Sequence, residues 1–99
     1  MTNSQIIAIG KTTVKEHRGA LRIWIEGSKP EKAGFIKGAQ FTYALVEGAL
    51  IVTLSAIPCR TVSSRNTLDI TTKELQHYFK AGDKLTVTYS ETMITFKRA

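Results

Sequence analysis

Side chains that could carry covalent or metal chemistry are few in this sequence and lie far apart. The two histidines, His17 and His77, are 60 residues apart, and Cys59 is the single cysteine. A zinc site needs three or four ligands, usually at short spacings, so no metal is expected. Neither a serine nucleophile elbow nor a glycine-rich phosphate loop is present. The sequence therefore predicts no cofactor and favours a protein that is not an enzyme.

Basic side chains are the more informative group. The net charge is +6 at pH 7, and the natural partners of such an excess are polyanions, nucleic acid before an anionic membrane surface. Residues 1–25 contain four bases and one acid, which gives +3, whereas residues 26–59 contain three of each. Arginine and lysine bind phosphates, and arginine can also read base edges. The candidate contacts are Lys11, Lys15, Arg18 and Arg22 in the first half, and Arg60, Arg65 and Lys73 in the second. For each of them the alternative is simple solvation of an exposed face.

The only tryptophan, Trp24, lies among the first group of bases. Leu21, Ile23 and Ile25 alternate with it, so a strand would place Trp24 on the opposite face together with Arg22. An aromatic ring on the solvent side can stack on an unpaired base. The alternative is that Trp24 covers an open end of the core.

Length and composition predict one domain, residues 1–99. A chain of 99 residues, 42% hydrophobic and 22% charged, has room for a single core. The lone cysteine favours a reducing compartment. No basic leader and no apolar run of ~20 residues is visible, so the sequence predicts a cytoplasmic protein that is not bound to a membrane.

The elements that must position these side chains follow one pattern twice, at an offset of 44 residues. When the two copies are aligned at this offset, Phe35 matches Phe79 and Gly38 matches Gly82. After each glycine, period-two alternation predicts a strand, a two-residue turn and a second strand. These segments are 41–46 and 50–54 in the first copy, and 85–90 and 93–97 in the second.

A short capped helix is expected before each of these glycines, within 28–36 and 72–79. Ser28 and Glu31 fit a capping box, and Thr71 and Glu74 repeat it. Gly38 and Gly82 would end the helices in the left-handed conformation. Phe35 and Phe79 would anchor the helices to the core.

A strand precedes each helix, at 21–25 and 67–70, and a basic extended stretch precedes each strand, at 11–18 and 59–65. Ile6 to Ile9 can add an edge strand. The repeat units are therefore about 6–55 and 59–98.

This order of elements resembles the AbrB/MazE/SpoVT superfamily of swapped-hairpin DNA-binding domains. Arg18-Gly19-Ala20-Leu21-Arg22-Ile23 is similar to the strand entry of that family, and Lys37-Gly38-Ala39-Gln40-Phe41 to its exit from the helix. The SymE-like toxin subgroup is closest, since it shares Ala33-Gly34-Phe35, Gly38 and Val46-Glu47-Gly48. Two features depart from it: Trp24 lies in the strand rather than just before the helix, and the second helix lacks the Ala-Gly-Phe signature.

The resemblance implies a mainly β fold with two short helices, a pseudo-symmetric β-barrel closed by two tandem units, as a monomer or homodimer. It also implies that the basic segment before the first helix meets DNA, with its counterpart in the second copy. We expect a nucleic-acid-binding protein, DNA favoured over RNA: a transcriptional regulator or a SymE-like toxin-type nucleoid binder. The alternatives are a small phage or mobile-element protein that inhibits a host protein or ribonucleoprotein, and a SymE-like RNA endonuclease.

Overall fold

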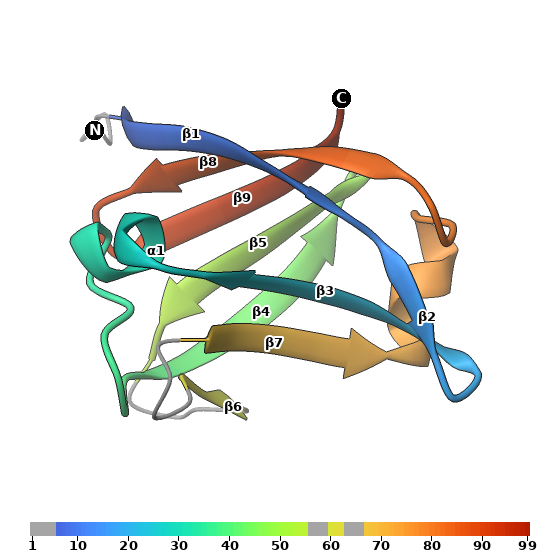
Figure 1. Ribbon diagram of the computed structural model, residues 1–99, viewed down its shortest axis with the longest axis horizontal. Helices are drawn as coiled ribbons and strands as arrows, with labels where there is room; N and C mark the ends of the chain where they lie inside the picture. Colours follow the sequence, from blue (N-terminus) through green and yellow to red (C-terminus); the bar gives the residue numbers. More distant parts are fainter. Residues whose placement is uncertain (1–5, 56–59, 63–66) are drawn as a thin grey trace.

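The computed structural model describes residues 6–55, 60–62 and 67–99 (Figure 1). Alternating apolar and polar residues make most of this chain extended, and short turns and two brief helices connect the strands. The elements are β1 (Ile6–Thr13), β2 (Lys15–His17), β3 (Ala20–Glu26), α1 (Ser28–Lys32), β4 (Gln40–Val46), β5 (Ala49–Leu54), β6 (Arg60–Thr61), β7 (Thr67–Thr72), η1 (Lys73–His77), β8 (Lys84–Ser90) and β9 (Met93–Arg98).

The strands form two antiparallel sheets that share one bent strand. The larger sheet has the order β1-β8-β9-β5-β4-β6, and the smaller one has the order β2-β3-β7. Val14 lies at the bend between β1 and β2, where its N–H donates to the Asp83 carbonyl (2.9 Å) and its carbonyl accepts from the Gly82 N–H (2.7 Å). The chain thus passes from one sheet into the other without a loop (Figure 1).

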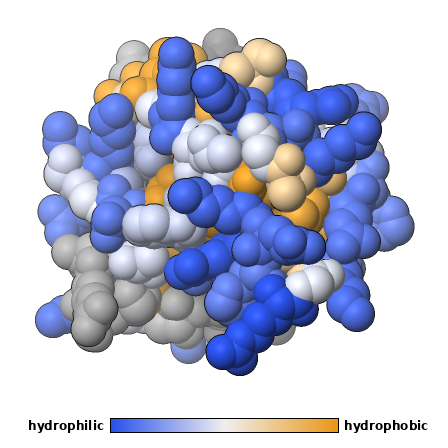
Figure 2. All heavy atoms as spheres, turned by 45° about the vertical axis from the view of Figure 1, so that its right-hand side comes forward, coloured by the Kyte–Doolittle hydropathy of each residue, from blue (hydrophilic) through white to orange (hydrophobic). Residues whose placement is uncertain are grey.

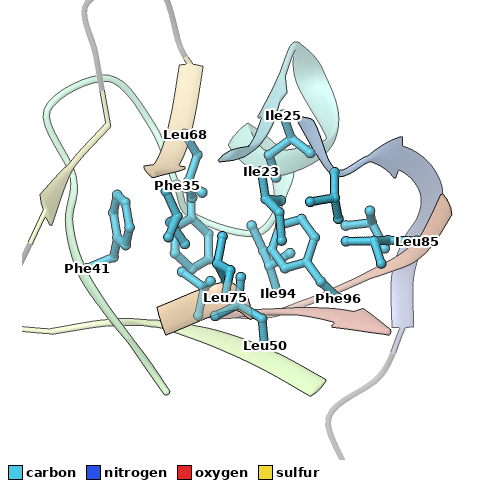
Figure 3. Close-up of a cluster of buried hydrophobic side chains, with 14 of the residues drawn as sticks. Ile23, Ile25, Phe35, Phe41, Leu50, Leu68, Leu75, Leu85, Ile94 and Phe96 are labelled. Atoms are coloured by element: carbon cyan, nitrogen blue, oxygen red, sulfur yellow. The ribbon is translucent and has the colours of Figure 1, made fainter. Parts of the chain in front are cut away.

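The core fills the space between the two sheets (Figure 3). Ile23 and Leu68 from the smaller sheet and Leu50 and Phe96 from the larger one are fully buried. The predicted inward faces of β3, β7, β8 and β9 are confirmed, because each of these strands buries alternate residues, whereas β4 buries only Phe41 of its predicted face. Phe35 and Phe79 are also buried, as predicted. The Phe35 ring meets that of Phe41 edge-on, with centroids 6.3 Å apart.

Several features recur at the predicted offset of 44 residues. β4 begins at Gln40 and β8 at Lys84, and β5 and β9 begin at Ala49 and Met93. In the pairing of β5 with β9, Ile51 lies opposite Thr95, its own counterpart in the repeat.

A pair of hydrogen bonds recurs as well. Val62 accepts from the Gly38 N–H (3.0 Å) and donates to the Ala39 carbonyl (2.9 Å), as Val14 does with Gly82 and Asp83. Both halves of the chain therefore use the same backbone contacts around their glycine turns.

The expected closed barrel is not found. Among the described residues, no ladder joins β7 to β6, the two strands at which the barrel would have to close. β6 contributes only two paired residues, Arg60 and Thr61, and both pair with β4. The arrangement is therefore two packed sheets, with β3 and β7 lying in front of β9, β5 and β4 in Figure 1.

Both helices differ from the prediction. α1 begins at Ser28, so the predicted cap is wrong: Gly27 is the N-cap, with φ of 100°, and no side chain caps the helix. α1 ends at Lys32 rather than near Gly38, because Gly34 already turns the chain with φ of 97°. The second helix, η1, is a 3₁₀ helix. Its cap is Thr72, whose hydroxyl accepts from the Glu74 N–H (3.3 Å).

Gly38 and Gly82 adopt the predicted left-handed conformation, with φ of 84° and 93°. A Cβ at either position would meet no atom within 4 Å, so the backbone alone requires glycine. We expect Gly38→Val and Gly82→Val each to lower the free energy of unfolding by about 1 kcal/mol or more, because a β-branched residue resists positive φ. Urea denaturation measures this. Ala81→Val, at an exposed turn position without positive φ, is the control, and equal losses in all three variants would contradict the explanation.

Candidate nucleic-acid interface

A hollow of about 480 Å³ opens where β1 separates from β3. β2 pairs with β3 through Lys15 and Arg22, but beyond the bend at Val14 the same strand pairs with β8 instead. β1 and β3 therefore diverge, as Figure 1 shows. Thr12 still bridges them, since its hydroxyl donates to the Trp24 carbonyl (3.0 Å).

The charged residues that line this hollow are mostly basic. Lys11 of β1, Lys15 of β2 and Lys29 of α1 contribute three positive charges, and Glu26 contributes one negative charge. The Lys29 ammonium donates to the Ile9 carbonyl (2.9 Å), which holds α1 against β1. We call these three lysines, with Trp24, the basic hollow. The structure thus brings together Lys11, Lys15 and Trp24, and adds Lys29, which the sequence analysis placed in the neutral middle.

Trp24 lies on the outer face of β3 together with Arg22, as predicted, and it is half-buried. The Arg22 guanidinium lies over the indole, 5.5 Å from the ring centroid. Its Nε donates to Asp69 Oδ2 (2.8 Å), and Nη2 lies 2.6 Å from the same oxygen. Asp69 on β7 therefore pairs with Arg22 and holds it above Trp24, so the charge of this candidate contact is balanced by a carboxylate.

Two further residues shape the interior of the hollow. Tyr89 of β8 lines it, and burial raises the pKa of the Tyr89 phenol above its ordinary value. A tyrosine phenol is protonated at neutral pH, so Tyr89 can donate a hydrogen bond. Gly10 of β1 leaves space here, because an added Cβ would lie 3.4 Å from Tyr89 Cε1 and 3.5 Å from Lys29 Nζ.

The remaining predicted site residues lie elsewhere. Arg18 is exposed in the β2–β3 turn with φ of 52°, followed by Gly19. Lys73 begins η1, whose Gln76 amide donates to the Gly19 carbonyl (3.5 Å), so it belongs to the end of the molecule that carries Arg18. Both lie away from the lining of the basic hollow.

The second basic segment does not join the first within the described residues. Arg60 belongs to β6, at the opposite edge of the larger sheet from β1 and Lys11. Arg65 and Cys59 lie outside the described residues. The expectation of a single face formed by both copies therefore stays a prediction.

The surface around the β2–β3 turn is mainly hydrophilic, as Figure 2 shows. Within the described ranges, no three His, Cys, Asp or Glu side chains gather in a way that could hold a metal ion. No helix in those ranges is long and apolar enough to cross a membrane. Three lysines around a half-buried indole are the main chemical feature of the basic hollow.

Asp69 limits the positive charge that the outer face of β3 can offer to a polyanion. We expect Asp69→Asn to raise affinity for DNA by about 3- to 10-fold at 0.1 M salt, because it frees one cation for a phosphate contact. Fluorescence anisotropy of a labelled duplex measures this. Glu47→Gln makes the same charge change in the β4–β5 turn and is the control. An equal gain in both variants would mean that net charge alone matters.

Comparison with known proteins finds no family model, no curated protein and no solved structure that matches this chain.

Proposed function

We propose that this protein binds nucleic acid, with DNA favoured over RNA. The observation that carries the proposal is the convergence of Lys11, Lys15 and Lys29, from three different elements, around the half-buried Trp24. Each phosphate neutralised by a lysine releases a condensed counterion, and this release drives binding. An indole beside these lysines adds a surface for a base.

The repeat supports a more specific form of the proposal. The matching bounds of β4 and β8, the pairing of Ile51 with Thr95 and the equivalent contacts of Val14 and Val62 are what two related units would produce. A tandem AbrB-type domain in a transcriptional regulator, or in a SymE-like toxin-type nucleoid binder, is the corresponding protein class. This class of domain would explain why Arg18-Gly19 precede the first residue of β3 and why Gly38 makes a turn before β4.

The test uses Trp24 as a reporter, since it is the only tryptophan. Addition of a mixed-sequence DNA duplex should change its fluorescence. Three phosphate contacts give a log–log salt slope of about −2.7, so affinity should fall by about 40-fold between 50 and 200 mM salt. An RNA duplex of the same sequence, titrated in the same way, tests the preference for DNA. Failure to bind either nucleic acid at 50 mM salt would overturn the proposal.

Exposed isoleucines on β1 favour a second function, binding to a protein partner. Ile6, Ile7 and Ile9 are 60%, 42% and 57% exposed on an edge strand. Exposed apolar residues at such an edge are typical of protein-binding surfaces. Replacement of Ile7 and Ile9 by threonine should leave DNA binding unchanged and abolish capture of a partner. Loss of DNA binding in this variant would instead assign the edge to the nucleic-acid interface.

A further inference from the structure

We propose that the basic hollow receives one unpaired DNA nucleotide, with its base against Trp24 and its neighbouring phosphates on the three lysines. This inference rests on the proposed function and names the form of DNA that the site takes. Pockets that enclose small ligands measure about 300–1,000 Å³, and the basic hollow, at about 480 Å³, lies in this range. Duplex DNA keeps its bases stacked inside, so only an unpaired base has a free flat surface to insert.

The aromatic surface is fixed before any ligand arrives. The Arg22 guanidinium lies over the indole at 5.5 Å, and Asp69 holds that guanidinium in turn. A further hydrogen bond from the Thr71 hydroxyl to Asp69 Oδ1 (2.8 Å) orients the carboxylate. Arg22 and Asp69 therefore hold the indole from one side, so a base would contact the part of Trp24 that lines the hollow, where Arg22 is not among the lining residues.

The charges set the orientation of the nucleotide. Glu26 lines the hollow and repels phosphate, but its carboxylate can accept hydrogen bonds from the amino groups of a base. The Lys29 ammonium uses one of its donors on the Ile9 carbonyl and has two left for phosphate oxygens. We therefore place the base inside, beside Trp24 and Glu26, and the phosphates on Lys11, Lys15 and Lys29.

A substitution at Gly10 can distinguish insertion of a base into the hollow from simple attraction of DNA to positive charge. An added Cβ at Gly10 would lie in the hollow between Tyr89 and Lys29, at ordinary contact distances from both. Gly10 has no positive φ, so a side chain at this position causes no backbone strain. Gly10→Leu should therefore reduce the space in the hollow without changing the net charge of the protein.

The experiment compares three DNA probes with the full chain: a 12-nucleotide single strand, its blunt duplex, and the same single strand with abasic sites at every position. We expect the single strand to quench Trp24 and to bind about 5- to 150-fold more tightly than the abasic strand, the range given by stacking of one base. Gly10→Leu and Trp24→Leu should each reduce binding of the single strand to the abasic level, measured by anisotropy. Their circular dichroism spectra and melting temperatures verify folding. Thr95→Leu, on β9 and outside the lining, is the control for added bulk and should leave the preference intact.

Other outcomes would overturn the inference. Equal affinity for the single strand and the abasic strand, or tighter binding of the blunt duplex that Gly10→Leu does not affect, would show that only phosphates are bound. Proposed DNA binding would then stand and the unpaired nucleotide would not. If an RNA single strand of the same sequence binds more tightly than the DNA single strand, the assignment of the site to DNA is contradicted. No binding of any probe would overturn the inference together with the proposed function.

Discussion

Replacement of Lys11, Lys15 and Lys29 together by alanine is expected to weaken DNA binding by about 100-fold at 0.1 M salt. All three lysines line one hollow, although they belong to β1, β2 and α1. Each lost phosphate contact should remove about one unit of the log–log salt slope, so the slope should shrink by two to three units. Anisotropy titrations of a labelled DNA over a series of salt concentrations measure both quantities.

The matched control for this variant replaces Lys37, Lys80 and Lys97 by alanine. These lysines are exposed and lie outside the lining of the basic hollow. Their replacement removes the same total charge as the first triple variant. We expect the control to lose less than about 10-fold in affinity. If both triple variants lose affinity equally, the protein attracts DNA through a diffuse positive field, and the basic hollow is not the interface.

Replacement of Phe35 by alanine is expected to lower the free energy of unfolding by about 3–5 kcal/mol. Phe35 is fully buried, packs edge-on against Phe41, and donates its N–H to the Pro30 carbonyl, which ties α1 to the core. Small domains have only about 5–15 kcal/mol of stability in total, so the variant should be close to unfolding. The midpoint of urea denaturation should fall, with little change in its slope.

Two other variants test this explanation of the Phe35 effect. Ile36 is the next residue but 54% exposed, so Ile36→Ala should change the free energy of unfolding by about 0.5 kcal/mol or less. Phe79 is buried at the equivalent repeat position, and Phe79→Ala should resemble Phe35→Ala. A loss of less than about 1 kcal/mol for Phe35→Ala would mean that the core rearranges around the vacated space.

Local patterns predicted the strands well and the helices poorly. The alternation of Leu85, Val87 and Tyr89 depends only on one face being buried, and that face is found buried. The cap at Ser28 was wrong because Gly27, with its positive φ, already makes the turn that a serine cap would have made. Closure into a barrel depends on pairing between strands, which no local pattern encodes.

The candidate site was predicted in part, for a related reason. A strand period places Arg22 and Trp24 on one face, and they do lie together. The Arg22 partner, Asp69, is 47 residues away and becomes its neighbour only through the pairing of β3 with β7. Lys29 reaches the site because α1 folds back on β1, as its bond to the Ile9 carbonyl shows. No local sequence pattern indicates that Asp69 lies beside Arg22 or that Lys29 lies beside β1.

The pairing of β1 with β8 has a consequence for how the chain folds during its synthesis. β1, the first strand, finds its partner only when residues 84–90 are available, and β5 and β3 likewise pair with β9 and β7. Contacts so distant along the chain slow folding, since long loops must close before any of them forms. A nascent first half on the ribosome therefore exposes apolar strand faces that have no cover. Folding should be cooperative, start late, and depend on protection of that half from aggregation until β8 and β9 emerge.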